Sequence, residues 1–139
     1  MNWAIAGLLS AIFGALVAIF GKIGLKNVDT TLATSIRAGV MAIFLLSLAL
    51  VIGKFRDIHT LTGRTMLYII LSGVAGAISW LFYFYALKNG PAGGVAALDR
   101  LSIVFVVVFA ALFLAESLTW KTGLGALVMA LGAFLIVWK

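Results

Sequence analysis

The sequence predicts an all-α integral membrane protein with five transmembrane helices, and composition and hydropathy patterning predict it together. Of the 139 residues, 65% are hydrophobic and only 10% are charged, whereas soluble domains are about 45–50% apolar and about 25% charged. The mean hydropathy is +1.25. The apolar residues form long runs of about the length that crosses a hydrocarbon core of about 30 Å. These runs lack the alternation of membrane β-strands. We therefore expect a multi-pass protein of the cell membrane (the inner or plasma membrane).

Charged residues and turn residues divide the apolar sequence into its spans. We expect spans at about residues 3–21, 31–52, 66–87, 95–115 and 118–138, within a single membrane domain covering residues 1–139. Lys22 follows the first span, Gly90 and Pro91 interrupt the helix after the third because proline cannot continue a helix, and Lys139 follows the fifth. No basic residue precedes the first run and no small-x-small cleavage site follows it, so we expect a retained span rather than a signal peptide.

Composition also excludes several functional classes. The sequence contains no cysteine and one histidine, His59, whereas a zinc site needs three or four ligands. It contains no Gly-rich phosphate loop and no set of residues for a Ser/His/Asp triad. We expect no enzyme activity, no catalytic residues, no metal and no cofactor. The net charge is +6, but most basic residues flank apolar runs, where they meet membrane lipids rather than nucleic acid.

Small residues at steps of three and four predict close helix packing. One series runs along the first span (Ala4, Gly7, Ala11, Gly14, Ala18 and Gly21) and another along the fifth (Thr119, Gly123, Ala126, Ala130 and Ala133). We interpret the first series as ordinary packing and the second as the better candidate for a dimer contact.

Loop charges do not decide the orientation in the membrane. Lys54, Arg56, Arg64 and Lys121 fall on one side, and Lys22, Lys26, Lys88 and Lys139 fall on the other. The positive-inside rule compares Lys and Arg in short loops, and here each side has the same number. A fixed orientation and insertion in both orientations are equally open.

Three charged residues lie inside predicted spans: Arg37, Asp99 and Arg100. A charge at the centre of a span costs about 2.5–3.5 kcal/mol on insertion scales, so such residues are candidates for a functional site. For Asp99, two structural roles together carry the same weight as a ligand or proton-binding role: a helix N-cap, with Ser102 three residues on, and a salt bridge with Arg37. Arg100 points about 100° away from Asp99 on a helix, so we do not expect these two to pair.

The third span carries small, polar and aromatic residues at helical spacing: Ser72, Gly76, Ser79 and Tyr83. Trp80 lies near mid-span, which is too deep for an interfacial aromatic belt. The stripe is typical of a helix that lines a wet cavity, and ordinary packing against a neighbouring helix is the alternative.

In this order, several short motifs resemble the five-span, EamA-type members of the drug/metabolite transporter superfamily. The matching stretches are Lys22 to Leu25, Ala33 to Arg37, Leu71 to Gly73, Ser79-Trp80, Tyr83 to Lys88, Asp99 to Ser102, and Glu116 to Thr119 with Gly123 and Gly132. The resemblance implies transport of a small molecule, and it implies that this chain is one half-unit of an inverted-repeat transporter fold. Transporter sites form between such repeats, so we predict a homodimer, with an antiparallel arrangement favoured and the site between its protomers.

We therefore predict a secondary transporter of a small metabolite or drug-like molecule that works by alternating access. The candidate substrate-binding residues are Trp80, Tyr83, Ser72, Ser79, Arg37, Asp99 and Arg100, with Asp99 as the candidate for proton coupling. The alternatives are a non-transporting membrane subunit that regulates or stabilises a partner, and a flippase for a lipid-linked substrate.

Overall fold

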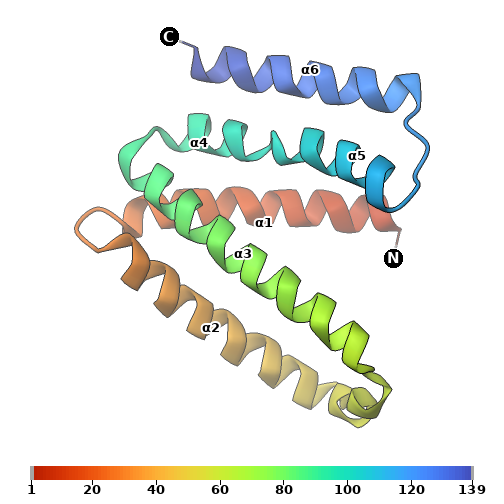
Figure 1. Ribbon diagram of the computed structural model, residues 1–139. Coiled ribbons are helices and arrows are strands. Elements are labelled where there is room, and N and C mark those ends of the chain that lie inside the picture. The colour runs from red at the N-terminus through yellow and green to blue at the C-terminus, as the bar shows by residue number, and fades with distance from the viewer. Residues whose placement is uncertain (1, 139) are drawn as a thin grey trace. The chain divides into compact units, whose positions relative to one another are not determined.

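The computed structural model describes residues 2–138, which form helices and no strands (Figure 1). The elements are α1 (Trp3–Gly24), α2 (Thr30–Val51), the 3₁₀ helix η1 (Lys54–Thr60), α3 (Gly63–Asn89), α4 (Ala92–Asp99), α5 (Ser102–Phe113) and α6 (Trp120–Val137). In this part of the chain, five stretches are long and apolar enough to cross a membrane: α1, α2, α3, the stretch Ala92–Phe113 and α6. The predicted all-helical class with five candidate spans is confirmed.

The outward-facing side chains of these helices are largely apolar. On α5, for example, Phe105, Phe109 and Phe113 are 60%, 53% and 79% exposed. Water-soluble monomers rarely expose contiguous apolar surface on this scale. The helices therefore present to their surroundings the kind of surface that lipid tails solvate.

The chain forms two compact units. One contains α1 as far as Lys22 together with α4, α5 and α6, and the other, Ile23–Lys88, contains α2, η1 and α3. The assignment of residues 1–139 to a single domain stays a prediction.

In the first unit, α6 packs along α4 and α5 and runs antiparallel to them (Figure 1). Small residues make this packing close: Ala126 and Ala133 of α6 are buried, and a Cβ atom on Gly94 of α4 would lie 3.8 Å from Val137 Cγ2 of α6. Small side chains allow helix backbones to approach in lipid. The small-residue face of α6, which we expected to form a dimer contact, is thus used at least in part within the chain.

The fourth apolar stretch is two helices, where the sequence predicted one span at 95–115. At the junction the Leu101 N–H donates to Leu98 O at 3.0 Å, and the Val104 N–H donates to Leu101 O at 2.9 Å. Such three-residue bonds tighten the backbone into a 3₁₀-like turn. Asp99 is the last residue of α4, and Leu101, at the N-cap position of α5, makes no side-chain capping bond. The alternative that Asp99 caps the following helix is therefore wrong.

In the second unit, α2 and α3 form an antiparallel hairpin joined by η1 (Figure 1). Asp29 caps α2, because its Oδ1 accepts the Leu32 N–H at 3.0 Å. After α2, Gly53 adopts a left-handed φ of 74°, which glycine reaches without the steric cost of a Cβ atom. Phe84 and Leu87 of α3 are buried, with Leu87 at 0% exposure. The cap at Asp29 therefore sets where α2 begins, and the turn at Gly53 sets where it ends.

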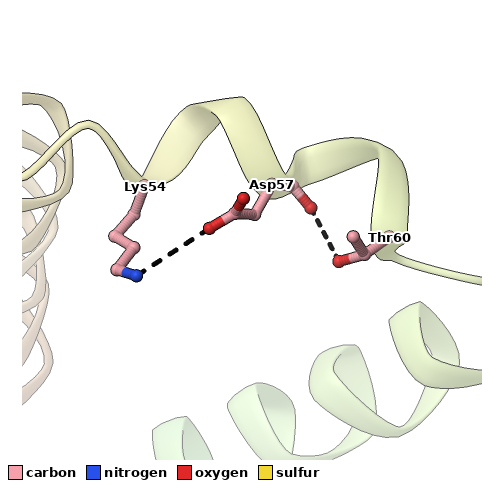
Figure 2. A network of polar contacts seen from close by, with 3 residues as sticks. All are labelled: Lys54, Asp57 and Thr60. Carbon is pink, nitrogen blue, oxygen red and sulfur yellow. Dashed lines mark hydrogen bonds and ion pairs between the residues drawn. The ribbon is translucent and has the colours of Figure 1, made fainter.

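The segment after α2 forms the 3₁₀ helix η1, which carries Lys54 and Arg56. Figure 2 shows its polar network: Lys54 Nζ lies 3.8 Å from Asp57 Oδ2, and Thr60 Oγ1 donates to the backbone oxygen of Asp57 at 2.7 Å. Residues three apart eclipse each other in a 3₁₀ helix, which brings these three onto one side. The Asp57 carboxylate is thus paired locally with a lysine of the same helix.

Two lysines at helix ends hold loop carbonyls. Lys22 Nζ, near the end of α1, donates to Gly90 O at 2.8 Å, and Lys88 Nζ, near the end of α3, donates to Val28 O at 2.9 Å. Charged donors make stronger hydrogen bonds than neutral ones. These residues, counted above only as loop charges, also tether their loops. Lys139, expected to close the last span, lies outside the described residues.

Candidate functional site

A cavity of about 400 Å³ lies between α2 and α3. Its walls combine one charged residue, two hydroxyl residues, one aromatic residue and small or apolar residues: Arg37, Thr34, Ser35, Trp80, Ala38, Met41, Gly73, Gly76, Ala77 and Leu81. The volume falls in the range of about 300–1,000 Å³ that is typical of small-molecule pockets. All lining residues belong to the Ile23–Lys88 unit, so the hairpin alone forms this cavity.

The Arg37 guanidinium stacks on the Trp80 ring. Arg37 Cζ lies 3.6 Å from the Trp80 ring centroid and 5.6 Å from that of Phe84. A guanidinium over an indole face gains about 2 kcal/mol when both are removed from water, against about 2.5–3.5 kcal/mol for placing a charge at the centre of a membrane helix. Trp80 thus offsets much of the cost of holding a positive charge in α2.

Tyr83 and Phe84 form an aromatic cluster with Trp80 that holds its ring in place. Tyr83 meets Trp80 edge to face at 5.3 Å between ring centroids, and Phe84 lies 5.7 Å from Trp80 and 6.2 Å from Tyr83. Aromatic pairs at these separations are worth about 0.5–1.5 kcal/mol beyond the area they bury. Since Phe84 is only 4% exposed, the cluster anchors Trp80 to a buried side chain of the same helix.

Two hydroxyl groups lie on the α2 wall just before Arg37. Thr34 Oγ1 donates to Thr30 O at 2.7 Å, and Ser35 Oγ donates to Thr31 O at 2.9 Å. Each hydroxyl has one proton, which these backbone bonds use, and its oxygen keeps lone pairs that accept. The α2 wall therefore offers the N–H groups of Arg37 as donors and the hydroxyl oxygens of Thr34 and Ser35 as acceptors.

The structure brings together some of the predicted site residues. Arg37 and Trp80 line the cavity, and Tyr83 contacts Trp80. Ser72 and Ser79 are exposed on α3 and are not part of the cavity wall. Successive residues of an α-helix point about 100° apart around the axis. Gly73 and Trp80, which directly follow the two serines, therefore line the cavity while the serines do not.

The two remaining predicted residues, Asp99 and Arg100, belong to the other unit. Both are exposed at the junction of α4 and α5. Arg100 reaches α1, because a Cβ atom on Gly14 would lie 3.3 Å from Arg100 Nη2. The glycine at position 14 thus leaves room for this guanidinium group.

Sequence reasoning missed most of the α2 wall and, on α3, Gly73, Ala77 and Leu81, whereas Gly76 was part of the predicted stripe. Thr34 precedes Arg37 by three residues and Met41 follows it by four, while Ala38 lies four residues after Thr34 and three before Met41. This spacing was the available signal. On α3, Gly73 and Gly76 form a glycine floor that leaves the space above the backbone open, since a Cβ atom at either would meet nothing within 4 Å.

The described residues contain no group of three or more metal-ligating side chains of the His, Cys, Asp and Glu types. What the cavity provides instead is a guanidinium held on an aromatic face, with hydroxyl oxygens to one side and open backbone to the other. Such a lining can bind the polar end of a small molecule while an apolar part lies along the helices.

Comparison with known proteins agrees with this picture. Residues 1–138 match the EamA-like transporter family. A Sinorhizobium protein described as an uncharacterized transporter in the cobO 3' region is 42% identical over 97% of this chain and 96% of its own length. An uncharacterized Methanocaldococcus jannaschii protein is 30% identical over 95% of this chain and 93% of its own.

A third similarity is partial: the pseudopaline exporter CntI of Pseudomonas aeruginosa is 38% identical over 50% of this chain, which covers 24% of the exporter. No solved structure matches the chain significantly. The family consists of transporters rather than enzymes. With a family match over nearly its whole length and a relative aligned from end to end, this multi-pass membrane protein belongs to the EamA-like transporter family.

Proposed function

We propose that the protein is a secondary transporter that moves a small metabolite or drug-like molecule across the cytoplasmic membrane by alternating access. The observation that carries the proposal is the α2–α3 cavity, which sets a charged and an aromatic side chain face to face between two candidate spans. Ionisable residues inside membrane helices mark substrate and ion pathways.

The substrate chamber, in this proposal, is completed by a second copy of the chain. The hairpin cavity holds about 400 Å³, which is near the lower end of the range for drug-sized ligands. Transporters of related design build their sites where two oppositely oriented repeats meet. An antiparallel homodimer supplies the second repeat, and the substrate then lies between Arg37 and Trp80 of one copy and the partner.

Asp99 is the proposed site of proton coupling. It ends α4 where the candidate span Ala92–Phe113 is interrupted. In transporters, interrupted membrane helices and the C-terminal ends of half-helices are where coupling cations bind, because the carbonyl end of a helix carries partial negative charge. A carboxylate at this position adds a protonatable group to that end.

The test is transport by pure protein in liposomes. Proteoliposomes are loaded with a defined mixture of amino acids, organic acids and aromatic drugs, a pH gradient is imposed, and mass spectrometry follows which components leave the lumen. We expect the wild-type protein to deplete at least one component faster than protein-free liposomes do. Asp99→Asn should lose the acceleration by the pH gradient while its amount in the membrane stays normal.

Two outcomes contradict parts of this proposal. If Asp99→Asn responds to the gradient as the wild type does, Asp99 has no part in coupling. If the wild-type protein depletes no component, a non-transporting subunit becomes the better interpretation, and co-purification with another membrane protein tests it. A flippase would instead deplete no soluble component and would move a lipid-linked compound from one leaflet of the liposomes to the other.

A further inference from the structure

We propose that the α2–α3 cavity binds an amphipathic anion, with its carboxylate or phosphate group on Arg37 and its apolar part along the glycine floor of α3. This inference rests on the proposed transport function and names the substrate class.

The first step concerns charge balance around Arg37. Its unit, Ile23–Lys88, contains two carboxylates, Asp29 and Asp57. Asp29 accepts the Leu32 N–H as the cap of α2, and Asp57 lies within 3.8 Å of Lys54 in η1. Neither is a cavity-lining residue. The cavity wall thus carries a positive charge and no negative one, which favours a ligand that brings its own.

The second step concerns which part of the guanidinium is available. Trp80 lies against the flat face of the Arg37 side chain, 3.6 Å from Cζ to the ring centroid. A guanidinium bonds carboxylate and phosphate through N–H groups at its planar edge, often two at once. Stacking on the ring therefore orients Arg37 without using the edge that recognises an oxyanion. The Thr34 and Ser35 oxygens beside it accept, which suits a hydroxyl or protonated group next to the anion.

The third step concerns the two ends of the cavity. Trp80 is level with Arg37 across the antiparallel hairpin. From there, Gly76 and Gly73 lie four and seven residues back along α3, or about 6 and 10 Å at 1.5 Å per residue. Met41 lies one turn beyond Arg37 on α2 in the same direction. The cavity is polar at Thr34 to Arg37 and apolar from there towards η1, so an apolar group of about 10 Å fits behind the anionic head.

The test compares three molecules that share a phenylpropyl skeleton and differ in head group: 3-phenylpropionate, 3-phenylpropanol and 3-phenylpropylamine. Binding is followed by fluorescence of Trp80 in purified protein whose other tryptophans (Trp3, Trp120 and Trp138) are replaced by phenylalanine. We expect the acid to bind at least tenfold more tightly than the alcohol, and the amine to bind more weakly than both.

Variants at Arg37 assign the preference to its side chain. Arg37→Gln should bind the acid and the alcohol with equal affinity, while alcohol binding changes less than threefold. Arg37→Lys keeps the charge without the fork and should retain a reduced preference for the acid. Arg56→Gln removes a basic residue of η1 outside the cavity and is the matched control. Retained binding of the alcohol shows that each variant is folded.

The results separate this inference from the transport proposal. Equal or tighter binding of the amine by the wild type, or an acid preference that survives Arg37→Gln, overturns the anion site. If the site fails while proteoliposomes still export a neutral or cationic compound, the transport function stands. If the acid binds as expected and no compound crosses the membrane, the substrate class stands and the transport proposal fails.

A final arm distinguishes the source of the anion. Phosphatidylglycerol is added to the protein in maltoside detergent during the 3-phenylpropionate titration. Unchanged acid affinity supports a free small molecule as the ligand. Competitive displacement by the lipid, lost in Arg37→Gln, supports the same anion chemistry on a lipid headgroup.

Discussion

A guanidinium inside a membrane helix needs an electron-rich surface or an anion, and Trp80 supplies the surface. The 3.6 Å stacking distance leaves Arg37 partly exposed towards the cavity. The residue is therefore held in place but not neutralised. At the scale of single residues, the site depends on Arg37 for charge, on Trp80 for orientation, and on two glycines of α3 for space.

The glycine floor gives a prediction about space alone. Gly76→Val places three carbon atoms where the structure has open cavity, because a Cβ atom there meets nothing within 4 Å. We expect at least a tenfold loss of transport of any compound that the wild-type protein moves in liposomes, with an unchanged unfolding temperature in detergent.

Gly39→Val is the matched control for that substitution. Gly39 lies on α2, also meets nothing within 4 Å, and is exposed away from the cavity lining. We expect a change in transport of less than twofold. Equal losses in the two variants would mean that the cavity does not carry the substrate.

At the scale of the elements, the helix ends are tied to loops by charged side chains. The bond from Lys22 Nζ to Gly90 O links α1 to the turn between α3 and α4, and it is partly buried. Leaving a buried hydrogen-bond acceptor unsatisfied costs about 1–3 kcal/mol, and a partly buried acceptor costs less than a fully buried one. Loop position in this protein therefore depends on specific lysines.

Lys22→Met should lower the free energy of unfolding by about 1–2 kcal/mol, since it leaves the Gly90 carbonyl without this donor. The measurement is unfolding in mixed micelles by increasing dodecyl sulfate. Lys26→Met removes the same charge four residues further on, just after the end of α1, and its exposed side chain gives an expected effect below about 0.5 kcal/mol. Both variants change the loop charge equally, so a difference between them reports on the bond. Equal effects would contradict the tethering role.

Hydropathy predicts the helices themselves, whereas their ends depend on side-chain caps, turns and local backbone hydrogen bonds. The five candidate spans were predictable because a bilayer demands long apolar runs. The break after Asp99 was not, because it arises from three-residue backbone bonds within an apolar sequence that reads as one continuous helix. The charge of Asp99 was visible, and its place at the end of α4 was not.

The sequence predicted those residues of the candidate site that are unusual in a membrane helix. It did not predict those that any membrane helix could carry. Arg37 and Trp80 stand out because a charge and a deep tryptophan are unusual inside a span. Gly73 and Ala38 resemble packing residues in any membrane helix. Ser72 and Ser79 drew attention as polar residues, yet the lining face is rotated from them by about one residue on α3. Of the residues singled out on α3, Gly76 and Trp80 line the cavity, and only the fold shows that the two serines do not.

At the scale of the whole molecule, the proposal of an antiparallel homodimer depends on how the chain inserts. Loop charges are balanced, with four Lys or Arg residues on each predicted side, and the positive-inside rule then favours neither orientation. Two of those lysines, Lys22 and Lys88, also bond to loop carbonyls. A chain whose Lys and Arg residues are balanced between its two sides can insert in both orientations and so supply both protomers of an antiparallel homodimer.

Because the sequence contains no cysteine, a single introduced cysteine can report directly how the chain is oriented in the membrane. Asn27→Cys lies between α1 and α2, and His59→Cys lies in η1, one span away and therefore on the opposite side of the membrane; both positions are exposed. In intact cells, a membrane-impermeant maleimide reaches only outward-facing thiols. Dual insertion predicts that each variant is labelled to about half of its total thiol. Full labelling of one variant and none of the other would establish a single orientation and rule out the antiparallel homodimer, because an inverted second repeat would then have to come from a different chain.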